Sequence, residues 1–202
     1  MNFRMIGYTI GQILRVEGVL MLLPLIVSLC YGESIWLWFL IPAASLAAIG
    51  SILALKVPAD RTIQAKEGFV IVGLAWTLMS VFGCLPFWIS GEIPVFIDAL
   101  FETISGFTTT GSTVLSNVEG LSYGMLFWRS FSHWIGGMGI LVLATALLPS
   151  MGVRSHYLAQ AESPGPVFSK LVPKQSQTSK ILYGIYCAMT LAEVALLKLA
   201  GM

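Results

Sequence analysis

The residues of this sequence best suited to chemistry are a cluster of hydroxyl side chains around one glycine. The cluster reads Thr108-Thr109-Thr110-Gly111-Ser112-Thr113. A cation that has shed its hydration water needs oxygen ligands instead, and the backbone carbonyls of a filter loop can supply them. Threonine hydroxyls add further oxygens, and a central glycine lets the backbone dihedrals alternate in sign. Thr109, Thr110, Gly111 and Ser112 are therefore predicted to bind a cation.

An ordinary polar connector is the simplest alternative for this cluster, because Thr, Ser and Gly are common between helices. A phosphate-binding loop is excluded, since that loop needs a Lys after its second glycine and Ser112 follows Gly111. The segment before the cluster favours a filter. Residues 94–105 are apolar but number only about a dozen, too few to cross a bilayer as a helix.

A half-helix of this length can position the loop. Pro94 suits its first turn and Gly106 suits its C-terminal cap. A helix that ends at the loop points the negative end of its dipole at a bound cation. Non-helical backbone at membrane depth is tolerated only inside protein or along a water-filled cavity. The order of span, half-helix, polar loop and span therefore predicts a re-entrant pore helix followed by a selectivity-filter loop.

The remainder of the chain is apolar enough to surround such a loop with membrane-spanning helices. Hydrophobic residues make up 56% of it and charged residues 10%, whereas soluble domains carry about 25% charged residues. We therefore expect an all-α integral membrane protein with lipid as its solvent, and the net charge of +1 argues against a nucleic-acid partner. Helices long enough to span are expected at about 10–31, 34–55, 69–90, 123–148 and 181–201.

Charge distribution predicts the orientation of these spans. Nine basic residues fall before the first span or in alternate connections: Arg4, Arg15, Lys56, Arg61, Lys66, Arg154, Lys170, Lys174 and Lys180. All nine face the cytoplasm if the N-terminus is cytoplasmic. The opposite side carries Glu33, Glu92 and Glu119, and the half-helix carries Asp98 and Glu102. This acidic side would concentrate cations at the entrance to the loop.

Charged groups near the loop have functional and structural interpretations. An Arg inside a span is costly unless it is paired, so Arg129 is expected to pair with Glu102 or Asp98 and brace the half-helix. An interfacial Arg that reaches toward headgroups is the alternative. Asp98 and Glu102 share a helix face, and with His133 they could serve an intramembrane enzyme. No nucleophile or metal-ligand set accompanies them, so an enzyme is not expected. Gly136, Gly137 and Gly139 predict either close helix packing or a gating hinge.

Three stretches resemble a known family. Residues 101–113 (FETISGFTTTGST) resemble the first filter segment of the Trk/Ktr/HKT family of potassium transporters. Residues 127–139 (FWRSFSHWIGGMG) resemble the inner helix of TrkH-type subunits, and residues 160–166 (QAESPGP) resemble the connector after it. The resemblance implies potassium uptake, with potassium bound at Thr109, Thr110 and Gly111. It also implies residues that support the filter: Thr108, Thr113, Glu102 and Arg129.

The family also implies a bacterial inner-membrane location, a homodimer and a cytosolic TrkA-type nucleotide-binding subunit, with no tightly bound cofactor. Its members build a pore from four linked repeats. The expected divisions are a two-helix segment at 1–66, a first pore repeat at 67–148, a cytoplasmic connector at 149–178 and the first helix of a second repeat at 179–202. This chain is thus expected to be a fragment or a truncated product, and a non-conducting fragment that binds other subunits is the alternative function.

Overall fold

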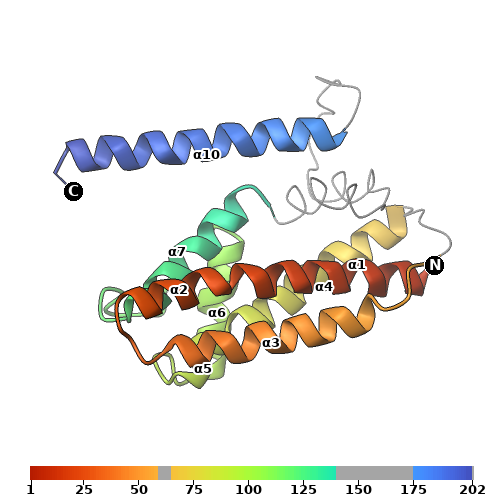
Figure 1. The fold of residues 1–202 in the computed structure, drawn as a ribbon, viewed down its shortest axis with the longest axis horizontal. Helices are drawn as coiled ribbons and strands as arrows, with labels where there is room; N and C mark the ends of the chain where they lie inside the picture. The colour runs from red at the N-terminus through yellow and green to blue at the C-terminus, as the bar shows by residue number, and fades with distance from the viewer. Residues whose placement is uncertain (59–64, 140–174, 202) are drawn as a thin grey trace.

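The computed structural model describes residues 1–58, 65–139 and 175–201. These ranges contain α-helices and the loops between them, with no strand (Figure 1). The all-α class predicted from the sequence is therefore confirmed. Four of the described helical segments are long and apolar enough to cross a membrane: Phe3–Cys30, Trp36–Leu53, Lys66–Ile89 and Lys180–Leu199.

The first span consists of two helices, α1 (Phe3–Leu20) and α2 (Leu22–Cys30). Pro24 explains the break, because it has no N–H for the carbonyl of Leu20 and its ring crowds that carbonyl. The helix begins at Phe3, where the Asn2 side chain accepts a hydrogen bond from the Met5 backbone N–H at 3.1 Å. The expected start near residue 10 is wrong, since the Asn2 cap lets the helix begin before the longest apolar stretch.

The early start of α1 changes the expected position of one basic residue near the N-terminus. Arg15 lies inside α1 and not before the first span. Its side chain passes beside Gly50 of the next helix, α3 (Trp36–Leu53), which returns antiparallel to α1. Figure 1 shows these two helices side by side over most of their length.

The second half of the chain follows the predicted order with different boundaries. Helices α4 (Ala65–Gly83) and α5 (Leu85–Ile89) together form the third span, and Pro86 near the start of α5 accompanies a break at Cys84. Then come the short helix α6 (Phe96–Phe107), a loop, and helix α7 (Tyr123–Gly137). The rest of the span expected at 123–148 lies beyond the described residues, which resume with α10 (Gln175–Leu199).

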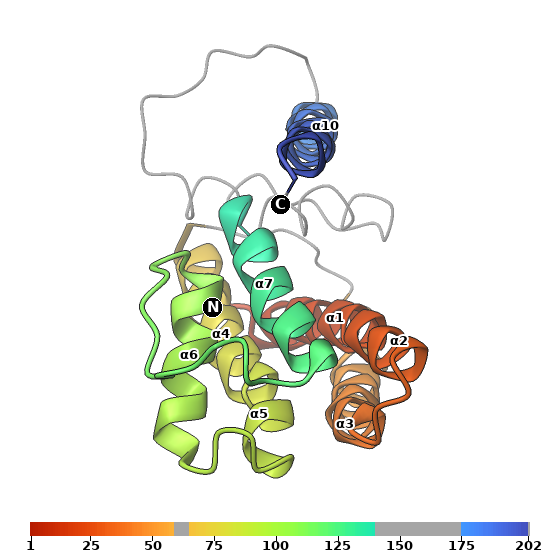
Figure 2. The same ribbon diagram turned by 90° about the vertical axis from the view of Figure 1, so that its left-hand side faces the viewer.

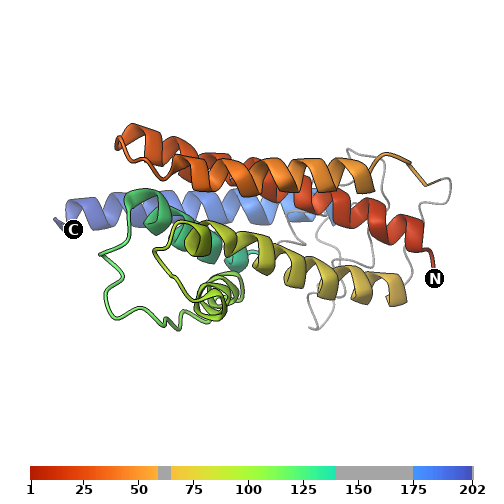
Figure 3. The same ribbon diagram turned by 90° about the horizontal axis from the view of Figure 1, so that it is seen from below.

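The final helix is longer than the span expected at 181–201. Helix α10 begins at Gln175, inside the connector expected at 149–178. The connector before that point falls outside the described residues. In Figures 2 and 3, α6 and α7 pack together beside the α1–α3 hairpin. In Figures 1 and 2, α10 stands apart from the other helices except near the end of α7.

Candidate functional site

Helix α6 is the half-helix expected before the loop, shifted by two residues. It contains 12 residues and ends at Phe107, with Thr108 as its C-terminal cap. The prediction that Gly106 ends the helix is wrong, because Gly106 lies within its last turn. A β-carbon at Gly106 would overlap Ser132 Oγ of α7. The missing side chain therefore permits close packing of α6 and α7. Pro94 likewise lies just before the helix and not in its first turn.

The backbone of the candidate loop, residues 108–113, turns sharply after α6. Thr109 donates its N–H to the Gly106 carbonyl at 2.9 Å, and Thr110 donates to the Ser105 carbonyl at 3.0 Å. Two residues take the left-handed conformation, Thr109 with φ +55° and Gly111 with φ +75°. Gly111 meets the expectation that one loop position needs a residue without a β-carbon.

The carbonyls of the loop differ in what they bind. Ser105 Oγ donates to the Ser112 carbonyl at 2.6 Å. Within the described part of the chain, no hydrogen bond ends on the carbonyl oxygens of Thr109, Thr110 or Gly111. These three consecutive oxygens are therefore available for a ligand, and every residue of the loop is exposed.

Glu102 connects the half-helix to α7 and to the segment of chain that leaves the loop. Its carboxylate is buried, and Oε1 accepts from Arg129 Nε of α7 at 2.6 Å. Oε2 accepts from Thr113 Oγ1 at 2.9 Å and from the Val114 N–H at 3.1 Å, where the chain leaves the loop. One carboxylate thus holds the exit of the loop and the following helix in a single network. The expected partner of Arg129 is Glu102 and not Asp98.

The groups that suggested an intramembrane enzyme do not converge. Asp98 is half-buried in the first turn of α6 and forms no ion pair among the described residues. His133 Nδ1 shares a hydrogen bond with the Arg129 carbonyl of its own helix at 2.8 Å. No group of three His, Cys, Asp or Glu side chains that could hold a metal ion occurs in the ranges that the structure describes.

Two residues of the expected acidic side have a role that the sequence did not reveal. Glu33 accepts from the backbone N–H groups of Tyr123 at 2.7 Å and Gly124 at 3.0 Å. Glu92 accepts from the Ser122 N–H at 3.1 Å and from Ser122 Oγ at 2.6 Å. Both carboxylates therefore cap the N-terminus of α7, where unpaired N–H groups and the helix dipole favour negative charge.

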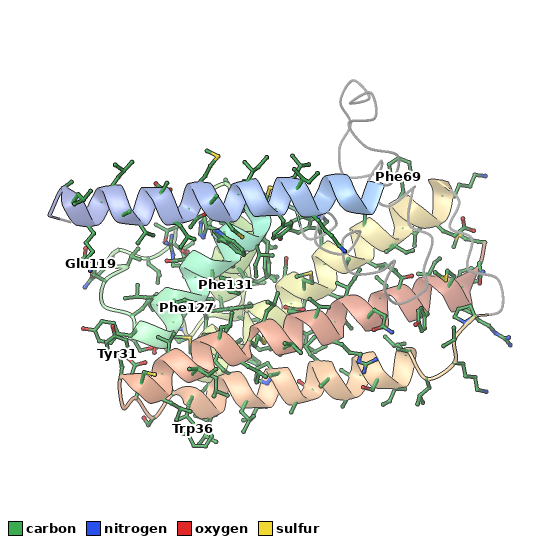
Figure 4. The ribbon with its side chains drawn as sticks, turned by 45° about the horizontal axis from the view of Figure 1, so that its top comes forward. Tyr31, Trp36, Phe69, Glu119, Phe127 and Phe131 are labelled. Carbon is green, nitrogen blue, oxygen red and sulfur yellow. The ribbon has the colours of Figure 1, made fainter. Side chains whose placement is uncertain are left out.

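Aromatic contacts lie at the same end of the molecule. The rings of Tyr31 and Tyr123 stack with centroids 4.2 Å apart, beside the two capping carboxylates. Glu119, the third acidic residue of this side, is exposed in the loop before α7. Figure 4 shows Glu119, Tyr31 and Trp36 gathered at this end, whereas Phe69 lies near the other. In the sequence, Ser122 before an apolar stretch signals the start of α7. No local pattern shows that Glu33 and Glu92, which are distant in the sequence, cap this helix.

We expect the loss of either cap to destabilise the protein. Glu33→Ala and Glu92→Ala each leave N–H groups of α7 without an acceptor, which costs about 1 kcal/mol per cap. The measurement is thermal unfolding of the purified full-length protein in detergent, with Glu119→Ala as the matched control. Equal melting temperatures for Glu33→Ala and the control would contradict the capping role of Glu33.

The three glycines of α7 occupy different environments. A β-carbon at Gly136 would lie 2.8 Å from the carbonyl carbon of Phe107 and 3.0 Å from the Gly106 oxygen, so α7 touches the α6 backbone there. A β-carbon at Gly137 would face the hydroxyl of Tyr186 in α10. Gly139, beyond the end of the helix, has φ +68°. Close packing therefore accounts for Gly136, whereas a gating role stays a prediction.

Besides the approach of Gly137 to Tyr186, helix α10 meets α7 at Trp134. Trp134 Nε1 donates to Thr190 Oγ1 at 3.1 Å, and the Tyr186 hydroxyl donates to the Trp134 carbonyl at 3.2 Å.

A second tryptophan of α7, Trp128, packs against α4 and α6. Its Nε1 donates to the Gly83 carbonyl at 2.9 Å, and its ring packs edge-on against Phe107. Trp128 and Phe107 are both buried and join α7 to α6 and to the end of α4.

Comparison with known proteins places this arrangement in a family. The TrkH family, described as a cation transport protein, matches residues 39–200. The Trk system potassium uptake protein TrkH of Salmonella typhimurium is 40% identical over 206 residues, and that of Halomonas elongata is 35% identical over 205 residues; each match covers 100% of this chain and 42% of the relative.

A solved structure agrees with these sequence matches. The crystal structure of the potassium transporter TrkH from Vibrio parahaemolyticus matches with a TM-score of 0.80 at 34% identity, over 100% of this chain and 40% of that chain. The chain thus spans about two fifths of the length of the relatives it matches.

Proposed function

Since this chain belongs to the TrkH family of cation transport proteins, we propose that it forms part of a potassium-uptake subunit and contributes one segment of the ion filter. The observation that carries the proposal is the set of three consecutive carbonyls at Thr109, Thr110 and Gly111, which have no hydrogen-bond donor among the described residues. Relatives at 35–40% identity are named as potassium uptake proteins, which supports potassium as the ion.

The chemistry proposed for the loop is replacement of hydration water by carbonyl oxygens. Thr109, Thr110 and Gly111 would bind the ion, with Ser112 next to them. Helix α6 ends at the loop, so its dipole favours a cation there. Thr108 and Thr113 would support the loop, together with the buried pair of Glu102 and Arg129.

The assembly around the loop is also a proposal. Residues 67–148 would form a first repeat of outer helix, re-entrant pore helix, filter and inner helix. Residues 1–66 would be an added two-helix segment, and residues 179–202 would open a second repeat. The remaining ligands of the ion would come from further repeats of the full-length protein. A homodimer and a cytosolic TrkA-type nucleotide-binding subunit are the partners that the family resemblance favours.

Restored growth tests the potassium function. The full-length protein should allow a bacterium without its own potassium-uptake systems to grow on limiting potassium, and its cells should take up rubidium. The chain of 202 residues is the comparison, because a non-conducting fragment would reach the membrane without restoring growth. Absence of rubidium uptake by a correctly inserted full-length protein would contradict the proposal.

The proposed location is the bacterial inner membrane with the N-terminus in the cytoplasm. This orientation follows from the positions of the Lys and Arg residues outside the helices, such as Lys56 between α3 and α4. Glu92, which caps α7, would then face outward. Single cysteines at Glu92 and Lys56 in a cysteine-free protein should therefore react with a membrane-impermeant thiol reagent from opposite sides. Labelling of both from one side would contradict the orientation.

A further inference from the structure

Glu17 of α1 is a buried carboxyl group that the proposed filter does not use. Its side chain is 1% exposed, and neither carboxylate oxygen has a hydrogen-bond partner in the described part of the chain. Glu102 is equally buried, but it receives three hydrogen bonds, one of them from an arginine. Buried polar atoms in proteins are nearly always hydrogen-bonded. Glu17 therefore differs from Glu102, and also from Glu67, a third buried carboxyl group of the described residues, whose Oε1 accepts from the Asn2 N–H at 3.1 Å.

The depth of Glu17 in the membrane follows from the packing of its neighbour. A β-carbon at Gly18 would lie 3.0 Å from the Ala43 carbonyl and 3.2 Å from the Leu46 side chain. Both residues lie in the middle of α3, which is an 18-residue span. Glu17 is therefore close to the centre of the bilayer, where an ionisable residue is costly and is treated as functional by default.

The carboxyl group lies close to the end of α4. A β-carbon at Gly83, where α4 ends, would lie 3.4 Å from Glu17 Oε1 and 3.0 Å from the side chains of Phe107 and Thr103 of α6. The next residue, Cys84, is buried at the junction of α4 and α5, and its thiol donates to the Val81 carbonyl at 3.2 Å. Glu17 thus lies where α1 meets the break in the third span, next to the inner side of the half-helix.

Among the residues that the structure describes, no charged group that could neutralise a carboxylate lies at this depth. Helix α3 contains no titratable residue, and α4 carries its charges, Lys66 and Glu67, at its first turn. Arg15 of α1 lies toward Gly50 of α3, and its side chain is exposed. Arg129 of α7 is already paired with Glu102. An ionised Glu17 would be an uncompensated buried charge, which proteins avoid by keeping the group neutral.

We propose that Glu17 is an intramembrane proton-binding site, held as the neutral acid where α1 contacts the junction of α4 and α5. The contact binds one proton from water when it forms and releases that proton when it opens. Because Gly83 lies between Glu17 and the half-helix, the packing of α4 on α6 would depend on the proton. The inference goes beyond the proposed potassium function and does not require it.

Infrared spectroscopy of the purified full-length protein tests the protonation state directly. A protonated carboxyl group has a carbonyl band that is distinct from the bands of a carboxylate. At neutral pH this band should be present, should shift after labelling with ¹³C-glutamate, and should decrease in Glu17→Gln. The exposed Glu119→Gln is the matched control and should leave the band unchanged. An undiminished band in a folded Glu17→Gln protein would overturn the proposal.

The dependence of stability on pH provides a second measurement. Raising the pH should lower the melting temperature of the wild-type protein, because it favours a charge at an apolar site, and Glu17→Gln should lose most of that decrease. Cys84→Ala should retain it, which separates Glu17 from the neighbouring thiol. If Glu17→Gln does not fold, Glu17→Met serves as the neutral variant. The wild-type protein also provides a test without any variant, because absence of a ¹³C-sensitive band from a protonated carboxyl group would overturn the proposal. Rubidium uptake is not needed for either result.

Discussion

Replacing Gly111 with serine should abolish most of the potassium selectivity of the full-length protein while leaving its membrane expression near normal. Gly111 has φ +75°, and no atom lies within 4 Å of an added β-carbon. The substitution therefore strains the backbone without a steric clash, at a cost of about 1–3 kcal/mol. Relief of this strain would rotate the peptides on either side of residue 111. In the proposed filter, this rotation would turn the carbonyls of Thr110 and Gly111 away from the ion.

The measurement is sodium competition of rubidium uptake, together with growth on limiting potassium. Gly91→Ser is a matched control, because Gly91 has φ +81° and open space around a β-carbon but lies between α5 and α6. The control should carry a similar strain and keep its selectivity. Thr109→Val removes only a hydroxyl group and should have a smaller effect than Gly111→Ser. Unchanged sodium competition in Gly111→Ser would remove the loop from the ion path.

Loss of Arg129 should be the most destabilising change of a charged residue near the loop. The Glu102 side chain is 0% exposed and that of Arg129 is 16% exposed. In Arg129→Gln, the Glu102 carboxylate keeps its hydrogen bonds from Thr113 and Val114 but loses its positively charged partner. Removal of one member of a buried pair costs about 3–5 kcal/mol. We expect a corresponding loss of thermal stability and, since Glu102 holds Thr113, a weaker preference for potassium.

A double-mutant cycle tests whether the pair acts as a unit. Glu102→Gln should partly rescue Arg129→Gln, because the double variant contains no unpaired buried charge. Interaction energies within such networks are about 0.5–3 kcal/mol. Asp98→Asn provides the control, since Asp98 forms no ion pair among the described residues. Its effect should add to that of Arg129→Gln. Strict additivity for Glu102 and Arg129 would show that the hydrogen bond between them contributes nothing measurable.

The helices were predictable where their length and apolarity are local properties. The spans at 34–55 and 69–90 correspond to Trp36–Leu53 and Lys66–Ile89, because a run of apolar residues must be buried in lipid whatever its neighbours are. Helix ends were predicted less well. Helix α1 begins at Phe3, where Asn2 caps it. Helix α10 begins at Gln175, before its apolar run, since polar residues can continue a helix that is already formed.

Of the candidate site, the sequence by itself determined the types of groups. The loop of hydroxyl residues around Gly111, the half-helix before it and an Arg that needs a partner are all local features of spacing and composition. Tertiary structure decided which groups meet. Asp98 and Glu102 share one helix face, and only the packing of α7 on α6 selects Glu102 as the partner of Arg129.

Residues that act over long sequence separations were determined by the tertiary structure alone. Glu33 caps a helix that begins 90 residues later, and Gly106 is needed because Ser132 of another helix occupies its side-chain space. Glu17 lies in an apolar run, but its lack of a partner depends on the helices around it. Periodicity and composition report on a residue's own helix, whereas capping, close approach and burial without a partner are properties of two elements brought together by folding.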